Sequence, residues 1–254
     1  MAGADIAVVL DRLDGVIADT VRTGGRTGYF AAMYRKVTLA VQDAVVAGRF
    51  DDSDRAGHFL RIFAERYLDA YRQWRSEEHP TAAWEAAFEA SRRWRPIILQ
   101  HLLVGMNVHI NLDLGIAAIT VAPGNELAGL RADFDRINAI LADLVDGLMD
   151  AVGAVSPWVG LLDRFGGRTD QTLIRFSIEI ARHRAWELAM QLAAAPSDER
   201  GEIIATRDMA TARLTKTILT PGPYLPVGLL FIRLRESNDV RQVIDLLGSD
   251  ASRM

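Results

Sequence analysis

A histidine and an aspartate lie four residues apart near the middle of the chain, inside its most apolar stretch. His109 and Asp113 belong to residues 96–122, PIILQHLLVGMNVHINLDLGIAAITVA, which contain no Lys, Arg or Glu. In a helix, side chains four residues apart are neighbours on one face. A carboxylate beside an imidazole fixes its tautomer and raises its basicity, as in general bases and metal ligands. The pair is therefore the candidate catalytic site, for acid–base or metal chemistry.

Four more polar residues interrupt the same stretch. They are Gln100, His101, Asn107 and Asn111. A buried polar group without a partner costs roughly 1–3 kcal/mol, so each of these side chains needs a partner in the protein or in a ligand. Asn107 and Asn111 are expected to orient substrate oxygens, and His101 is a further candidate for substrate binding. A polar network that only ties helices together is the alternative.

Helical geometry places these polar residues on two sides of one central helix. Pro96 suits its first turn, and Pro123-Gly124 suits its end. At about 100° per residue the two rows are His101, Gly105, His109 and Asp113 on one side and Gln100, Asn107 and Asn111 on the other. A surface helix has a single polar face, so this one is predicted to have neighbours all round. It is long enough to span a membrane, but its polar groups argue against that.

The rest of the chain has helical spacing of apolar residues, with Gly and Pro between the segments. The expected segments are 4–19, 27–48, 54–76, 81–94, 96–122, 125–152, 156–165, 169–195, 197–219, 226–234 and 237–247. Thr81, Ser197 and Ser237 are the expected caps of the helices that follow them. No segment alternates as a strand does. We predict one all-α domain over residues 1–254, a bundle of about nine or ten helices around a buried central helix.

Aromatic residues recur at every fourth position in residues 54–76. The row consists of Phe59, Phe63, Tyr67 and Tyr71. Such a row is more typical of a core, but it can also line a pocket for an apolar ligand. Under the second interpretation Tyr67 is a candidate substrate-binding residue.

Residues 125–152 carry Leu, Phe and Ile at alternating spacings of three and four, which predicts a seam packed against a neighbouring helix. Asp133 and Asp135 lie beside this seam and are expected on a solvated face. Asn138 also lies beside it and is the residue expected to reach inward, where it would contact the substrate.

Residues 169–195 carry Glu179, His183 and Glu187 at intervals of four. This spacing can present metal ligands from one helix face, although a charged outer face is the simpler interpretation. Trp186 on the same helix is a candidate substrate contact.

Composition narrows the classes of function. The chain has 254 residues, half of them hydrophobic, a net charge of −4 and no cysteine. It therefore has no basic surplus for nucleic acid and no thiol chemistry, and it fits a reducing compartment. The N-terminus, MAGADIAVVLDRLDG, lacks the basic region of a signal peptide, so a cytoplasmic location is expected. Walker, GxGxxG, GxSxG and HExxH motifs are absent, which leaves acid–base or metal chemistry.

Residues 105–115, GMNVHINLDLG, resemble the central motif of a bacterial family known as a domain of unknown function. The motif reads Gly-Met-Asn-x-His-Ile-Asn-x-Asp-Leu, and the matching residues are Gly105, Met106, Asn107, His109, Ile110, Asn111, Asp113 and Leu114. Weaker similarity extends to 28–38, 134–141 and 182–186. The resemblance implies a cytoplasmic helical protein of similar length with a site at this motif, and it implies no particular reaction.

A looser likeness is to the all-helical zinc phospholipase C and nuclease P1 group, which binds metal through His-xxx-Asp and His-xxx-Glu pairs on buried helices. His109-xxx-Asp113 and His183-xxx-Glu187 are similar pairs. The chain departs from that group because it has only five histidines, no N-terminal Trp ligand and no secretion signal. The likeness implies a divalent metal such as Zn or Fe on these four residues, and no other cofactor is expected.

Three functions fit these observations. The favoured one is an intracellular enzyme that acts on a small, largely apolar molecule, with His109, oriented by Asp113, as acid or base. Hydrolysis, isomerisation or cyclisation in specialised metabolism would suit it. The alternatives are a metal-dependent hydrolase and a non-catalytic helical binding or scaffold protein, in which the polar rows only fix helix register. The expected partner is a small-molecule ligand, without nucleic acid or a membrane span, and a homodimer is left open.

Overall fold

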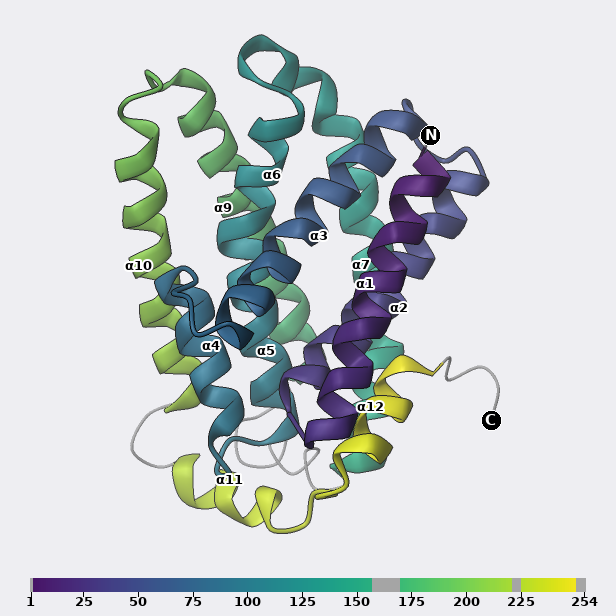
Figure 1. Cartoon of the computed structure of the whole chain (residues 1–254), viewed down its shortest axis with the longest axis vertical. Helices are drawn as coiled ribbons and strands as arrows, with labels where there is room; N and C mark the ends of the chain where they lie inside the picture. The colour runs from purple at the N-terminus through teal and green to yellow at the C-terminus, as the bar shows by residue number, and fades with distance from the viewer. Residues whose placement is uncertain (1, 157–169, 221–224, 250–254) are drawn as a thin grey trace.

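The computed structural model describes residues 2–156, 170–220 and 225–249, and within these ranges every regular element is a helix (Figure 1). The α-helices are α1 (Ala2–Thr23), α2 (Thr27–Val46), α3 (Ser53–Arg75), α4 (Ala82–Arg92), α5 (Ile98–Val108), α6 (Leu114–Val121), α7 (Leu127–Val155), α9 (Asp170–Ala194), α10 (Arg200–Leu219), α11 (Leu225–Arg233) and α12 (Val240–Gly248). The all-α prediction is confirmed. The helix predicted over 156–165 lies, apart from Ser156, outside the described residues.

The predicted central helix is present and is formed by α5, the π-helical turn η1 (His109–Asp113) and α6 in succession. Among the described residues, Ile98–Val121 is the one helix long and apolar enough to cross a membrane, and 89% of its most apolar window is buried inside the protein. It is therefore the core helix of the bundle. The expectation of a regular α-helix was wrong at η1, where one extra residue widens the turn. Such π turns are frequent at functional sites.

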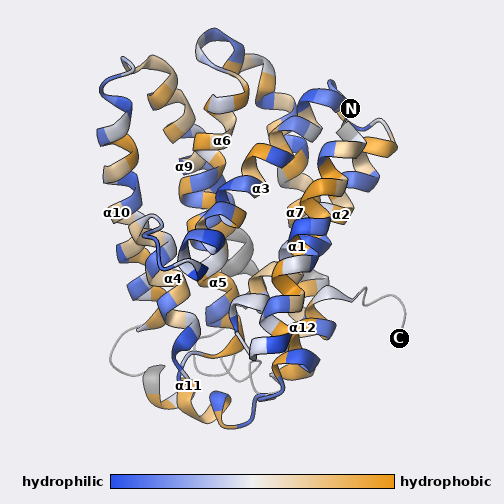
Figure 2. Ribbon diagram, in the orientation of Figure 1, coloured by the Kyte–Doolittle hydropathy of each residue, from blue (hydrophilic) through white to orange (hydrophobic). Residues whose placement is uncertain are grey.

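Helices surround the central helix on all sides, as its two polar rows predict. Helices α2, α3, α4, α9 and α10 all contact it, and α7 packs on α2 and α9 and also touches α6. In Figure 2, α1 and α10 change repeatedly between hydrophilic and hydrophobic residues, as expected for helices with one face in solvent. The motif of residues 105–115 is thus enclosed by helices from both halves of the chain.

Two glycines of the central helix let its neighbours come close. A Cβ atom at Gly105 would lie 2.5 Å from Cδ2 of Phe30 on α2. At Gly115 it would lie 2.5 Å from the carbonyl oxygen of Ala185 on α9. Real Cβ contacts are longer, so a side chain at either position would push the packed neighbour away. The space that Gly105 leaves is therefore filled by the protein and not by a ligand.

The cap of α4 comes from a distant helix. Thr81 occupies the N-cap position as predicted, but its side chain makes no capping bond to a described residue. Instead the carboxylate of Asp208, on α10, accepts hydrogen bonds from the N–H groups of Ala82 and Ala83, both at 2.8 Å. A carboxylate at a helix N-terminus pairs with unsatisfied N–H groups and with the helix dipole. Helix α10 is thereby tied to α4.

Two other predicted caps were wrong. Helix α10 begins at Arg200 and not after Ser197, because residues 197–199 form a turn. Helix α12 is capped by Asp239, whose side chain accepts from the N–H of Gln242. Ser237 supports this cap from outside the helix, since its hydroxyl accepts the N–H of Asp239. Asp is as good a cap as Ser, so composition alone could not choose between them.

Candidate functional site

The centre of the site is a buried histidine–aspartate hydrogen bond on the π turn. The Nδ1 atom of His109 lies 3.1 Å from Oδ2 of Asp113, so the contact expected from their spacing is formed. Asp113 is fully buried and also accepts hydrogen bonds from Trp84 Nε1 on α4, at 2.9 Å, and from Arg66 Nε on α3, at 3.3 Å. Three donors from three elements hold this carboxylate in place. A buried carboxylate needs such partners to remain ionised.

The surroundings of His109 favour a neutral imidazole with one free nitrogen. Burial lowers its pKa below the ordinary value, while the adjacent Asp113 carboxylate opposes that shift. Since Nδ1 faces a carboxylate, hydrogen-bond logic places the proton on Nδ1 and the lone pair on Nε2. Nε2 is buried, and no described residue is its hydrogen-bond partner. His109 thus has the protonation state of a general base.

Aromatic side chains form the walls around His109. The Phe63 ring stacks on the imidazole with centroids 3.7 Å apart, and Tyr34 presents its edge at 4.5 Å. Tyr67 lies further out, at 6.3 Å. The hydroxyls of Tyr34 and Tyr67 are also buried without a hydrogen-bond partner among the described residues, and burial raises the pKa of both phenols. Three neighbouring side chains thus each carry a buried polar atom without a described protein partner, which costs roughly 1–3 kcal/mol each.

An apolar cavity of about 70 Å³ borders this cluster. His109 and Tyr34 lie in its wall, and the remaining lining comes mostly from apolar side chains of α2, α3, α7 and α9. Lys36 and Arg182 also border it, and none of the described lining residues is acidic. Burial lowers the pKa of Arg182 to about 10, so its guanidinium stays charged at neutral pH. Apolar cavities of this kind stay dry and accept apolar molecules.

The cavity explains a feature of α7 that the sequence did not predict. The first half of its apolar seam, from Leu127 to Ile137, is buried against neighbouring helices. In the second half, Leu141, Leu144 and Leu148 are only half-buried, because they line the cavity. The seam was predicted to pack against a helix along its whole length, but its C-terminal half lines the cavity instead.

The second polar row of the central helix serves the fold. Asn107 donates to the carbonyl oxygen of Thr211 and to the hydroxyl of Thr215 on α10, at 3.1 and 3.0 Å. Asn111 donates to the side-chain oxygen of Asn107 at 3.0 Å. Gln100 donates to the carbonyl of Ile218 at 2.8 Å. This row therefore fixes the register of α10 against the central helix. Asn107 and Asn111 do not line the cavity, although the sequence analysis expected them to orient substrate oxygens there.

His101 lies one turn before Gly105 on the row of His109, yet it belongs to different surroundings. It is buried beside Tyr29, with ring centroids 5.9 Å apart. Burial lowers its pKa to about 3, and the cations Arg26 and Arg233 act in the same direction. It does not line the cavity. Its predicted role in substrate binding is not supported by this placement.

The remaining substrate candidates are spread over the molecule. Tyr67 is packed behind the cavity wall, next to His109. Trp186 packs on Phe134 and lies under the guanidinium of Arg131, in a separate cleft between α7 and α9. Asn138 is on α7, but its side chain is outside the described part of the structure.

The four predicted metal ligands do not form one site. His183 and Glu187 lie on the outer face of α9, with side chains 70% and 50% exposed, whereas His109 and Asp113 are buried. Within the described ranges, no three His, Cys, Asp or Glu side chains come together as a metal site would require. The charged outer face was thus the correct interpretation for α9, because the apolar side of that helix packs on the central helix.

Comparison with known proteins identifies the family. The model of a family of unknown function, DUF5995, matches residues 6–221. The chain belongs to DUF5995. No curated protein and no solved structure shows significant similarity to it. The match covers the whole site described above and ends before α11 and α12 of this DUF5995 chain.

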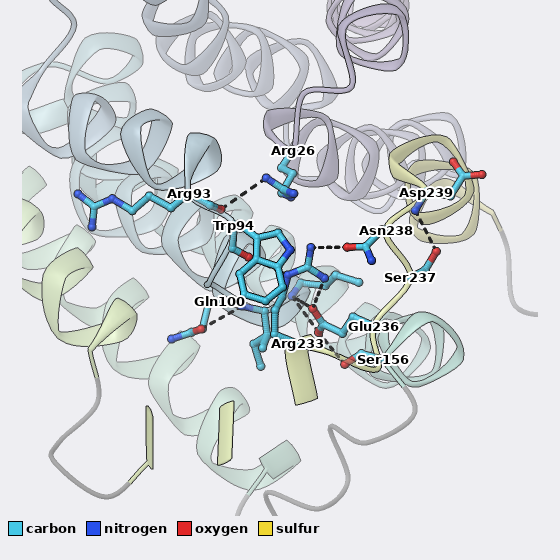
Figure 3. A network of polar contacts seen from close by, with 12 residues as sticks. Arg26, Arg93, Trp94, Gln100, Ser156, Arg233, Glu236, Ser237, Asn238 and Asp239 are labelled. Carbon is cyan, nitrogen blue, oxygen red and sulfur yellow. Dashed lines mark hydrogen bonds and ion pairs between the residues drawn. The ribbon is translucent and has the colours of Figure 1, made fainter. Parts of the chain in front are cut away.

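The C-terminal segment of this DUF5995 chain nevertheless supports the central helix (Figure 3). Glu236 is buried, and its carboxylate accepts the N–H of Ile98 at 3.0 Å and the hydroxyl of Ser156 at 2.7 Å. Arg233 lies 3.5 Å from the same carboxylate. Burial raises the pKa of Glu236, while these contacts oppose that shift. Residues after the family match thus cap the helix that carries the site.

Sequence reasoning missed several residues of the site. Arg66 and Tyr34 gave no signal, since each stands alone among ordinary helical residues.

Asp133, on α7 and away from the site, was expected in solvent but is fully buried. Its carboxylate accepts hydrogen bonds from the N–H of Asp51 at 2.9 Å and from Arg55 at 2.8 Å. These contacts, made across the α2–α3 turn, hold the pKa of Asp133 below its usual value in spite of burial. The sequence signal that could have predicted this burial is the position of a charged residue next to an apolar seam.

Proposed function

We propose that this DUF5995 protein binds a small, largely apolar molecule inside the cell and acts on it by acid–base chemistry at His109. The reaction classes that suit such a site are hydrolysis, isomerisation and cyclisation. The observation that carries the proposal is the free Nε2 lone pair of a neutral imidazole, oriented by a buried carboxylate, in the wall of an apolar cavity.

Each residue of the cluster has a defined part in this proposal. Nε2 of His109 takes a proton from the substrate or from a water molecule and later returns it to another atom. Asp113 holds the Nδ1 proton and stabilises the imidazolium that forms in between. The hydroxyl of Tyr34 stays protonated, because its pKa is raised, and donates a hydrogen bond to a substrate oxygen. Nε2 is closed to solvent, so a ligand reaches it after a side chain of the wall rotates.

The scaffold alternative accounts for only part of the structure. It requires all four polar residues of the motif to be bonded to protein groups, with no cavity beside them. Asn107, Asn111 and Asp113 meet that condition, whereas His109 meets it only at Nδ1, because its Nε2 has no partner among the described residues and its side chain borders the cavity. The motif therefore combines a structural row with one side chain, His109, that has an unpartnered nitrogen and borders the cavity.

Turnover of a panel of apolar esters, ketones and epoxides tests the proposal. For a substrate found in this way, His109→Gln should lower kcat about 100-fold, the usual contribution of a general base. Val41→Phe, which fills the cavity from α2, should abolish binding while the fold persists. The matched control is His101→Gln, a buried histidine of the same row outside the cavity, and it should retain wild-type kcat. Equal turnover by wild type and His109→Gln would exclude the proposed role.

A further inference from the structure

Helix α11 turns a large apolar face outward at the lower end of the bundle (Figures 1 and 2). The exposed side chains are Val227 at 63%, Leu230 at 41%, Phe231 at 58% and Leu234 at 58%. Their spacing of three, one and three residues places them on one side of the helix. The opposite side holds Ile232 and Arg233, which are buried. The helix is thus amphipathic, with part of its apolar surface in solvent.

Trp94 is a further exposed apolar residue, held at the C-terminal end of α11. Its side chain is 44% exposed. Arg233 holds it in place, because Nε donates to the Trp94 carbonyl at 2.8 Å and the guanidinium lies 5.3 Å from the indole centroid (Figure 3). An indole fixed at the protein surface is typical of a membrane–water interface.

Arginines flank the same face. Arg93 and Arg95 adjoin Trp94, Arg235 follows Leu234, and all three are exposed. Glu236, the acid next to Arg235 in sequence, is buried inside and bonded to Ile98 and Ser156. The chain as a whole carries a net charge of −4, so this basic cluster is a local feature. We call Trp94, Val227, Leu230, Phe231 and Leu234, with Arg93, Arg95 and Arg235, the α11 surface.

We propose that the α11 surface binds an anionic lipid bilayer. The apolar side chains would enter the boundary between headgroups and acyl chains, with α11 lying in the plane of the membrane, and the arginines would contact lipid phosphates. Each basic residue near such a surface contributes about 1 kcal/mol, or about a fivefold change in affinity. The inference is independent of the chemistry proposed for His109.

Charge and size argue against a second copy of the chain as the occupant. A two-fold interface brings the same patch of both copies together, so the arginines of one copy would face those of the other. The patch is also small, because a helix of nine residues is only about 13 Å long. A stable protein interface needs about 800 Å² and 20–30 residues on each side. Binding to a lipid surface needs neither a large contact area nor a self-complementary patch.

Vesicle flotation of the full chain tests the proposal. Wild type should float with vesicles of phosphatidylcholine containing about 30% phosphatidylserine at about 0.15 M salt, and much less with phosphatidylcholine alone. Leu230→Ser with Phe231→Ser should weaken binding at least tenfold, and Arg93→Glu with Arg95→Glu should weaken it by a similar factor. All four positions are exposed, so the fold should persist, and a thermal melt checks this.

The matched controls lie at the turn between α2 and α3. Val46 is 80% exposed and Arg49 is exposed, and Val46→Ser with Arg49→Glu should bind as wild type does. The proposal is overturned if wild type does not bind the anionic vesicles, or if patch and control variants bind equally. It is also overturned if sedimentation shows a wild-type dimer that Phe231→Ser dissociates, since the surface would then join two copies.

Discussion

Asp113→Asn should lower the free energy of unfolding by about 4 kcal/mol, the usual cost of breaking a buried ion pair. The carboxylate accepts from three donors, with Trp84 and His109 on Oδ2 and Arg66 on Oδ1. An asparagine has only one accepting oxygen, so its NH₂ group must face at least one of these N–H donors in either orientation. Urea unfolding at pH 7.5 measures the difference.

Asp135→Asn is the control for this prediction. Asp135 lies on α7 with its side chain 51% exposed and paired to Arg131, so its replacement should change stability by less than about 0.5 kcal/mol. If both variants were equally stable, Asp113 could not have the buried, triply bonded environment described above.

His101→Phe should remove a large part of the acid sensitivity of the fold. Burial lowers the pKa of His101 to about 3, against about 6.5 in an unfolded chain. Between these values the unfolded chain binds a proton that the folded chain excludes, so stability is complete above pH 6.5 and is lost as pH falls. Between pH 7.5 and 4.5 this residue alone should cost about 3 kcal/mol.

Urea unfolding of wild type and variant at these two pH values isolates the effect of His101. The phenylalanine variant should lose about 3 kcal/mol less than wild type, whatever its stability at pH 7.5. Other groups, such as His109 and Glu236, titrate in both proteins and cancel in the comparison. His183→Phe, at an exposed position of α9, should keep the wild-type difference. An unchanged pH dependence in His101→Phe would show that this imidazole is protonated in the folded state.

The sequence predicted the central helix and the contact within its motif because both depend on local spacing. A run without Lys, Arg or Glu had to be buried, and residues four apart had to meet. The π turn was not predictable, since it depends on how η1 packs against α3, α9 and α10 and not on the residues of the turn alone. The partners of Asp113 were equally hidden, because Arg66 and Trp84 come from separate helices.

The sequence also could not separate the two polar rows of the central helix. In the sequence, Asn107 and His109 are both polar residues of one apolar run. Their surroundings differ. Asn107 faces Thr211 and Thr215 of α10, whereas His109 faces aromatic rings of α2 and α3. Only the order of helices around the core decides which of these side chains keeps an atom without a protein partner.

The central claim is that His109 is a neutral base whose Nε2 is kept for a ligand. Two-bond ¹H–¹⁵N correlation spectra of the ¹⁵N-histidine-labelled protein test it most directly, with His109→Gln to assign the signals. We expect a neutral Nδ1–H tautomer at pH 7 whose pKa lies below the ordinary value of a histidine, because burial disfavours the charged form, with the Nε2 shift of an unprotonated nitrogen. A proton on Nε2, or an imidazolium at pH 7, would contradict the account.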